Sequence, residues 1–99
     1  MAIDFLQACG LLQGELQGFF RQMRWSKGDE LQVQAAIARL RRAVDQLEPL
    51  ADDPGEGWYD LAMEQRWGYR RLLSHLGTAS HALKHVELVP HGRRLQAQF

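Results

Sequence analysis

Apolar residues recur at alternating steps of four and three along most of the chain, and this spacing is the strongest constraint on its fold. In an α-helix, residues three and four apart share one face. No segment of useful length alternates apolar and polar residues as a half-buried strand would. The three stripes are Phe5, Cys9, Leu12, Leu16, Phe19 and Met23; Val33, Ile37, Leu40, Val44 and Leu47; and Trp58, Leu61, Tyr69, Leu72, Leu76, Ala79, Leu83 and Val86. The sequence therefore predicts an all-α fold, a small bundle of three long helices.

Capping and breaking residues predict where the first two helices begin and end. Asp4 is suited to cap the first helix, and Ser26, with Asp29 three residues on, has the spacing of a capping box for the second. Pro49 is expected to end the second helix, because proline cannot donate a backbone hydrogen bond inside a helix. Residues 48–57 are rich in proline, glycine and carboxylates, which predicts a loop.

The third apolar stripe begins at Trp58 and keeps its phase across Gly77. Two outcomes are open: one long helix, straight or kinked, or a break at Gly77 that gives a short fourth helix. Pro90 is expected to stop the helix in either case. We therefore expect one helical domain over residues 1–89 and a flexible C-terminal tail over residues 90–99.

Three glycines form a row opposite the apolar stripe of the first helix. Gly10, Gly14 and Gly18 are four residues apart, and Trp25 shares their side. Each glycine in a helix interior costs about 1 kcal/mol relative to alanine, which is large against a typical total stability of about 5–15 kcal/mol. Close packing against another helix, from this chain or from a partner, would offset that cost; a bare face exposed to water would not.

The third helix also carries large side chains away from its core stripe. If the helix continues through Gly77, these are Met63, Trp67, Arg70, Ser74, His81 and His85. Tryptophan, methionine and arginine are enriched at the centres of protein interfaces. Either another part of the chain covers Trp67, or Trp67 is an anchor for a partner.

The net charge is zero, but the charges are divided along the chain. Residues 43–65 carry seven acidic groups and no lysine or arginine, whereas residues 66–99 carry six basic groups against Glu87 alone. The acidic and basic segments are expected to face each other in the fold or in a neighbouring copy. Zero net charge argues against nucleic acid as the main partner, because phosphate binding depends on excess positive charge.

Composition also predicts where the protein acts. Cys9 is the only cysteine, which excludes an internal disulfide and fits a reducing cytoplasm. There is no run of about 18 apolar residues for a membrane span and no basic leader of a signal peptide. Arginine outnumbers lysine ten to two, which is typical of a GC-rich bacterial or phage genome. We expect a cytoplasmic protein that binds no membrane.

The stretch "SHALKH" suggests two kinds of site. His81 and His85, four apart, could reach one metal ion from a helix, but two imidazoles do not make a site. "HALK" resembles the motif of histidine-phosphotransfer proteins. That resemblance implies His81 as phosphoacceptor and Lys84 as the group that neutralises the phosphoryl charge. The family has a small residue where His85 stands here, and a further helix after the motif.

The stretch "RRLLSH" places Arg70 and His75 five residues apart. This spacing resembles the Arg-x4-His pattern of HEPN-type ribonucleases, in which a polar residue usually follows the arginine, as Arg71 does here. The resemblance implies a ribonuclease that uses Arg70 and His75.

No phosphate-binding loop and no convincing nucleophile–base pair is visible. We therefore expect a non-enzymatic helical protein–protein interaction module, an adaptor, chaperone or regulator or inhibitor of another protein, which forms a homodimer. We expect no catalytic residue, cofactor, metal or small-molecule substrate. The phosphotransfer protein and the ribonuclease are the alternatives. The candidate interface residues are Gly10, Gly14, Gly18, Trp25, Met63, Trp67, Arg70, His81 and His85.

Overall fold

The computed structural model describes residues 4–26, 29–52 and 55–97, apart from the side chains of residues 26, 55, 56 and 87–97. Three α-helices are formed, α1 (Phe5–Ser26), α2 (Glu30–Leu47) and α3 (Met63–Ala97). Two short 3-10 helices, η1 (Glu48–Ala51) and η2 (Gly55–Asp60), connect α2 to α3. No strand occurs in the described ranges. The prediction of an all-α bundle of three long helices is confirmed.

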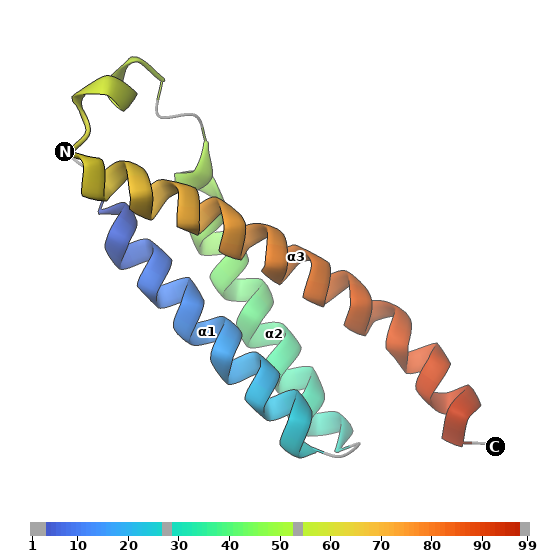
Figure 1. Ribbon diagram of the computed structural model, residues 1–99. Helices are drawn as coiled ribbons and strands as arrows, with labels where there is room; N and C mark the ends of the chain where they lie inside the picture. The colour runs from blue at the N-terminus through green and yellow to red at the C-terminus, as the bar shows by residue number, and fades with distance from the viewer. Residues whose placement is uncertain (1–3, 27–28, 53–54, 98–99) are drawn as a thin grey trace.

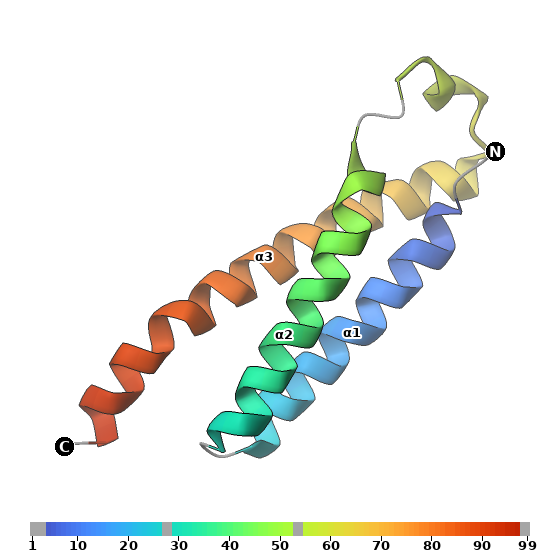
Figure 2. The same ribbon diagram turned by 180° about the vertical axis from the view of Figure 1, so that it is seen from behind.

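Helices α1 and α2 form an antiparallel hairpin, and α3 lies across it (Figure 1). Helix α3 begins beside the start of α1 and runs in the same direction, and its C-terminal end diverges from the hairpin, as the view from behind also shows (Figure 2). The molecule is elongated, with principal extents of 57 × 19 × 17 Å.

The three predicted apolar stripes meet in one core. Leu12, Leu40 and Leu72, one from each helix, are the largest fully buried side chains and mark its centre. The other buried apolar residues are Phe5, Ala8, Cys9, Leu16 and Phe19 of α1; Ile37, Ala43 and Val44 of α2; and Tyr69, Leu76, Ala79, Ala82, Leu83 and Val86 of α3. Met23, Val33, Leu47, Trp58 and Leu61 pack against this core partly buried.

At Gly68 the backbone of α3 closely approaches the start of α1. A Cβ atom at Gly68 would lie 2.8 Å from the backbone nitrogen of Leu6 and 3.0 Å from its Cα atom. Two contacts flank this point: the backbone N–H of Phe5 donates to Oε1 of Gln65 at 2.9 Å, and the Phe5 and Tyr69 rings meet edge to face at 5.0 Å. Only glycine allows the two backbones to come this close.

The caps of α1 and α2 are formed by aspartates. Oδ1 of Asp4 accepts from the backbone N–H of Gln7 at 3.0 Å, so the predicted first cap is confirmed. The predicted cap Ser26 was wrong: Ser26 is the last residue of α1, and the N-cap of α2 is Asp29, whose side chain accepts from the backbone N–H groups of Leu31 and Gln32. A carboxylate beside the positive end of a helix dipole satisfies these donors well.

Helix α3 begins at Met63 and not at Trp58. The guanidinium of Arg66 donates to the carbonyl oxygens of Trp58 and Tyr59, at 3.0 and 2.7 Å. In a continuous helix, backbone amides four residues on would take these acceptors. The chain forms η2 instead, and Pro49 ends α2 as predicted, within η1. The predicted loop over residues 48–57 thus includes short 3-10 turns, and residues 53–54 lie outside the described residues.

Helix α3 is continuous through Gly77, so there is no break and no short fourth helix at this position. The predicted end before Pro90 was wrong, because α3 runs to Ala97. Proline removes one backbone donor, but its fixed φ is helical, so the turns on either side can continue. The division into a domain over residues 1–89 and a flexible tail over 90–99 stays a prediction.

We predict that Gly68→Ala lowers the free energy of unfolding by about 1–3 kcal/mol, the usual cost of an overpacked contact. The backbone of Leu6 is the obstacle, and it cannot rotate away as a side chain could. Gly77→Ala is the matched control in the same helix, where a Cβ meets nothing within 4 Å. It should raise stability by up to about 1 kcal/mol through helix propensity. Urea denaturation measures both; equal stability of the two variants would contradict the packing described.

Candidate functional site

The glycine row of α1, formed by Gly10, Gly14 and Gly18, is exposed. A Cβ atom at any of the three positions would meet nothing within 4 Å, so no described part of this chain packs against the row. Gly14 and Gly18 line an open groove of about 560 Å³ between α1 and α2, together with Ala35 and Ala36. The described residues therefore do not provide packing within the chain, which leaves a partner helix or a face bare to water as explanations for the row.

An ion pair lies along this groove. Arg39 of α2 donates from Nε and from one terminal nitrogen to the two carboxylate oxygens of Glu15, at 2.7 and 3.2 Å. The hydrogen bond and the charge of Glu15 raise the pKa of Arg39. Glu15 is therefore directed toward α2 and away from the outer surface that α1 shares with α3.

Helix α3 presents large apolar side chains to the outside at its start. Met63 is 76% and Trp67 54% exposed. The guanidinium of Arg71, one turn after Trp67, lies 4.7 Å from the Trp67 ring, so a cation covers part of that ring. Further along the same side of α3, at helical spacing, His81 and His85 are exposed. The sequence-predicted residues of α3 are thus at the surface, and no described part of the chain buries Trp67.

Arg70, another predicted interface residue, contacts this chain instead. Its guanidinium lies 5.6 Å from the Trp58 ring, which in turn packs edge to face on Tyr69 at 5.5 Å. Arg70 is exposed, but it belongs to a group of side chains that holds η2 against α3. Trp25, predicted from α1, is 69% exposed at the end of that helix.

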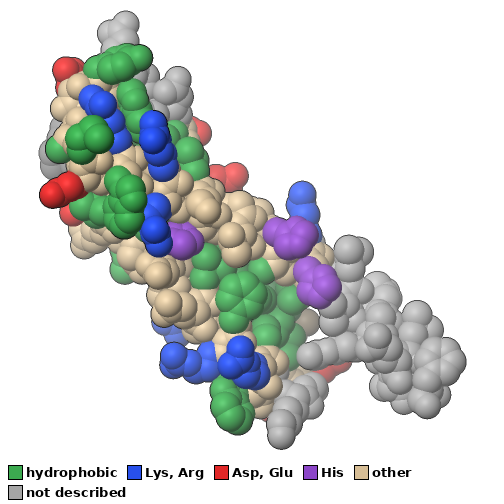
Figure 3. Space-filling view, viewed as in Figure 1, with side chains coloured by type: hydrophobic (Ala, Val, Ile, Leu, Met, Phe, Trp, Pro, Cys, Tyr) green, Lys and Arg blue, Asp and Glu red, His purple; other side chains and the backbone are tan. Residues whose placement is uncertain are grey.

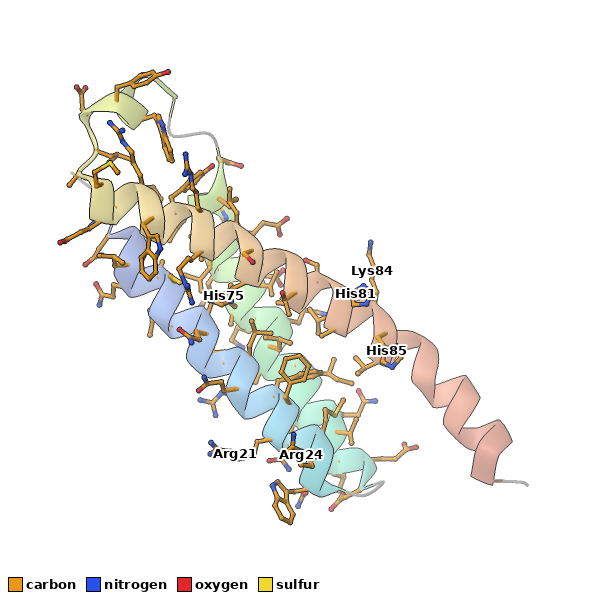
Figure 4. The ribbon with its side chains drawn as sticks, viewed as in Figure 1. Arg21, Arg24, His75, His81, Lys84 and His85 are labelled. Atoms are coloured by element: carbon orange, nitrogen blue, oxygen red, sulfur yellow. The ribbon has the colours of Figure 1, made fainter. Side chains whose placement is uncertain are left out.

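Helix α1 adds apolar and cationic side chains to the same side of the molecule. Phe20 is 48% exposed, and Arg24 follows it by one turn, whereas Arg21 lines the groove between α1 and α2. Figure 4 shows Arg21 and Arg24 at the end of α1, and His81 and His85 on α3. Sequence reasoning missed Phe20, although its position off the core stripe of α1 was an available sign.

We call this surface the α1–α3 face and define it by Met63, Trp67, Arg71, His81 and His85 of α3 and Phe20 and Arg24 of α1. In the space-filling view, hydrophobic, basic and histidine side chains gather on it, and acidic side chains lie at its edges (Figure 3). The described side chains of α3 after Glu64 include no carboxylate, and α1 has only Glu15, which pairs with Arg39. The face is therefore apolar and cationic.

His75 lies on the side of α3 that turns toward α1 (Figure 4). Its Nε2 atom is buried without a hydrogen-bond partner among the described residues. Burial, and secondarily the nearby charge of Arg71, lower the pKa of His75 below its ordinary 6.5. Both effects favour the neutral form of the imidazole in the folded chain.

The sequence motifs for chemistry do not come together in the described structure. Arg70 and His75 are five residues apart on one helix, a rotation of about 140°, and Arg70 contacts Trp58 while His75 turns toward α1. His81 and Lys84 are both exposed on α3, with the bulky His85 beside them. Among the described residues, no three His, Cys, Asp or Glu side chains are placed to hold a metal ion.

Comparisons with known proteins add no relative: no protein family, curated protein or solved structure matches the chain. Within the described helices, none is long and apolar enough to cross a membrane.

We predict that His75 makes stability depend on pH. Because the folded-state pKa lies below 6.5, the unfolded chain binds more protons as the pH falls below that value. This contribution to stability is therefore fully present above pH 6.5 and is lost as the pH falls through 6.5 toward the lower folded-state pKa. Melting temperatures of the wild type and His75→Gln at pH 7.5 and 5 test it. Between pH 7.5 and 5, the melting temperature of the variant should fall less than that of the wild type. An equal fall in the two proteins would contradict the assignment to His75.

Proposed function

We propose that this chain is a non-enzymatic protein-binding module, of the adaptor, chaperone or regulator type, which binds its partner on the α1–α3 face. The exposure of Trp67 is the observation that carries the proposal. A tryptophan that is 54% exposed beside a methionine that is 76% exposed leaves apolar area in water that no core requirement explains. Scattered exposed apolar residues are ordinary, but here two adjacent turns of one helix contribute them.

The energetics favour a role in binding. Full burial of one large apolar side chain contributes about 1.5–3 kcal/mol, so Trp67, Met63 and Phe20 together could supply a substantial part of a micromolar affinity of about 8 kcal/mol. Tryptophan and arginine are the residues most enriched among those that dominate interface energies. Arg71, already placed over the Trp67 ring, would enter such an interface with less loss of side-chain freedom.

The two alternatives depend on residues of α3. Arg70 and His75 face different neighbours, and among the side chains that the structure describes, no third metal-ligating group joins His81 and His85. No observation favours the phosphotransfer or ribonuclease alternative over the binding role.

We further propose that the chain self-associates as a dimer through the glycine row. The row is exposed, and nothing in the described chain fills the space beside it. The close approach of a second helix would offset the loss of stability that three glycines cause in a helix. The binding role and the cytoplasmic location proposed from the sequence do not depend on this dimer.

Photocrosslinking in the cell of origin tests the binding role. A photoreactive residue at Ser74, exposed two turns after Trp67 on the same side of α3, should form an adduct with a protein, and Trp67→Ala should abolish most of it. Leu31→Ala is the matched control, because Leu31 is 84% exposed on α2, away from the face. A second probe at the exposed Gln34 of α2 should form no comparable adduct. If the Ser74 adduct is missing, or is indifferent to Trp67→Ala, the binding role is wrong.

Light scattering at micromolar concentration tests the dimer. The measured mass should be twice the chain mass of 11.4 kDa, and Gly14→Leu should return it to one chain without unfolding the protein. Gly77→Leu, a substitution at another helix glycine with open space around it, should leave the mass unchanged. A wild-type mass of one chain would refute self-association.

A further inference from the structure

The charges of the α1–α3 face are of one sign over a long distance. From Trp67 to the end of the described side chains of α3, and along α1 apart from Glu15, every formally charged side chain is an arginine or lysine. Glu15 is already held by Arg39 across the α1–α2 groove, with Nε 2.7 Å from the carboxylate. From Trp67 onward, a partner on this face would therefore meet arginines, and the carboxylates lie only at its edge, at the start of α3.

Each of the two exposed aromatic rings of the face, Trp67 and Phe20, is followed by an arginine one helical turn later. Arg71 lies 4.7 Å from the Trp67 ring. Arg24 is one helical turn after Phe20, so the two side chains share one side of α1. The face thus repeats the same pair, an aromatic ring with an arginine, at both ends. Phe5 of α1 contacts Tyr69 of α3, so Phe5 marks the end of α1 that lies near Trp67. Phe20 is fifteen residues further along α1, and at 1.5 Å per residue it lies about 22 Å from that end.

We propose that the partner segment bound on the α1–α3 face is an acidic, amphipathic stretch of another protein, with apolar side chains for Trp67 and Phe20 and carboxylates for Arg71 and Arg24. This inference rests on the proposed binding role and names the chemistry of the partner. A segment of about fifteen helical residues spans the distance between the two aromatic–arginine pairs. Helices bind in this way, with anchors spaced along one side.

Charge complementarity favours this occupant over two others. A second copy of this chain would present an α1–α3 face of the same positive sign, so like charges would meet if the faces were paired. Single-stranded nucleic acid would also fit cations and rings. However, the zero net charge of the chain gives it no long-range attraction for a polyanion, and acidic residues flank the face at the start of α3.

The test identifies what is covalently attached to the Ser74 probe. The cross-linked peptide should come from another protein and carry net negative charge, and Arg24→Glu should reduce the adduct at least tenfold. Arg42→Glu is the matched control, since Arg42 is an exposed arginine of α2 outside the face. The yield should fall between 50 and 500 mM salt, because exposed charges are screened over about 10 Å at 0.1 M.

A cross-linked peptide that is neutral or basic, a nucleotide adduct, an adduct between two copies of this chain, or a yield indifferent to Arg24→Glu would each overturn the acidic partner. These results differ from the failure of the proposed binding role, in which no Ser74 adduct depends on Trp67. A Trp67-dependent adduct with a neutral peptide would therefore leave the binding role in place and remove only this inference.

Discussion

The backbone contact between Gly68 and Leu6 is the constraint on which the arrangement of α1 and α3 depends. With the Cβ position of Gly68 only 2.8 Å from the backbone of Leu6, any larger residue would push the two helices apart. The neighbouring contacts depend on this distance. Phe5 binds Gln65 through its backbone and Tyr69 through its ring, and the hydroxyl of Tyr69 donates to the carbonyl oxygen of Ala51 in η1. One glycine thus fixes α3 against α1 and, through Tyr69, against the connection from α2.

The same contact determines what reaches the surface. Because successive residues of a helix turn by about 100°, Gly68 facing α1 directs Trp67 to the outside. Arg71 follows one turn later and covers the Trp67 ring. The α1–α3 face is therefore a consequence of how the two helices pack, and its positive sign follows from the engagement of Glu15 with Arg39 on the other side of α1. The core and the proposed binding face thus use the same two helices, but different sides of them.

Apolar spacing was enough to predict the helices and the core, because a residue's place on the helix surface follows directly from its position in the chain. It could not say which face of one helix meets which other helix. For that reason it left open whether the glycines of α1 meet another helix of this chain, and the structure places the close approach within the chain at Gly68 instead. The predicted start of α3 at Trp58 was wrong, because the guanidinium of Arg66 donates to the carbonyl oxygen of Trp58, a contact that apolar spacing does not reveal. The spacing placed Met63 and Trp67 away from the core stripe but left open whether another part of the chain covers Trp67. Phe20 and the charge of the face emerged only once α1 and α3 were placed side by side.

Nuclear Overhauser effects between backbone protons test the central contact most directly. If α1 and α3 pack as described, the Hα protons of Gly68 should give strong cross-peaks to the backbone protons of Leu6, since a Cβ at Gly68 would be 3.0 Å from the Leu6 Cα. Gly77, which no other helix approaches, should give no such interhelical cross-peaks. Helical signals for both segments without any cross-peak between Gly68 and Leu6 would contradict the packing, and with it the origin of the α1–α3 face.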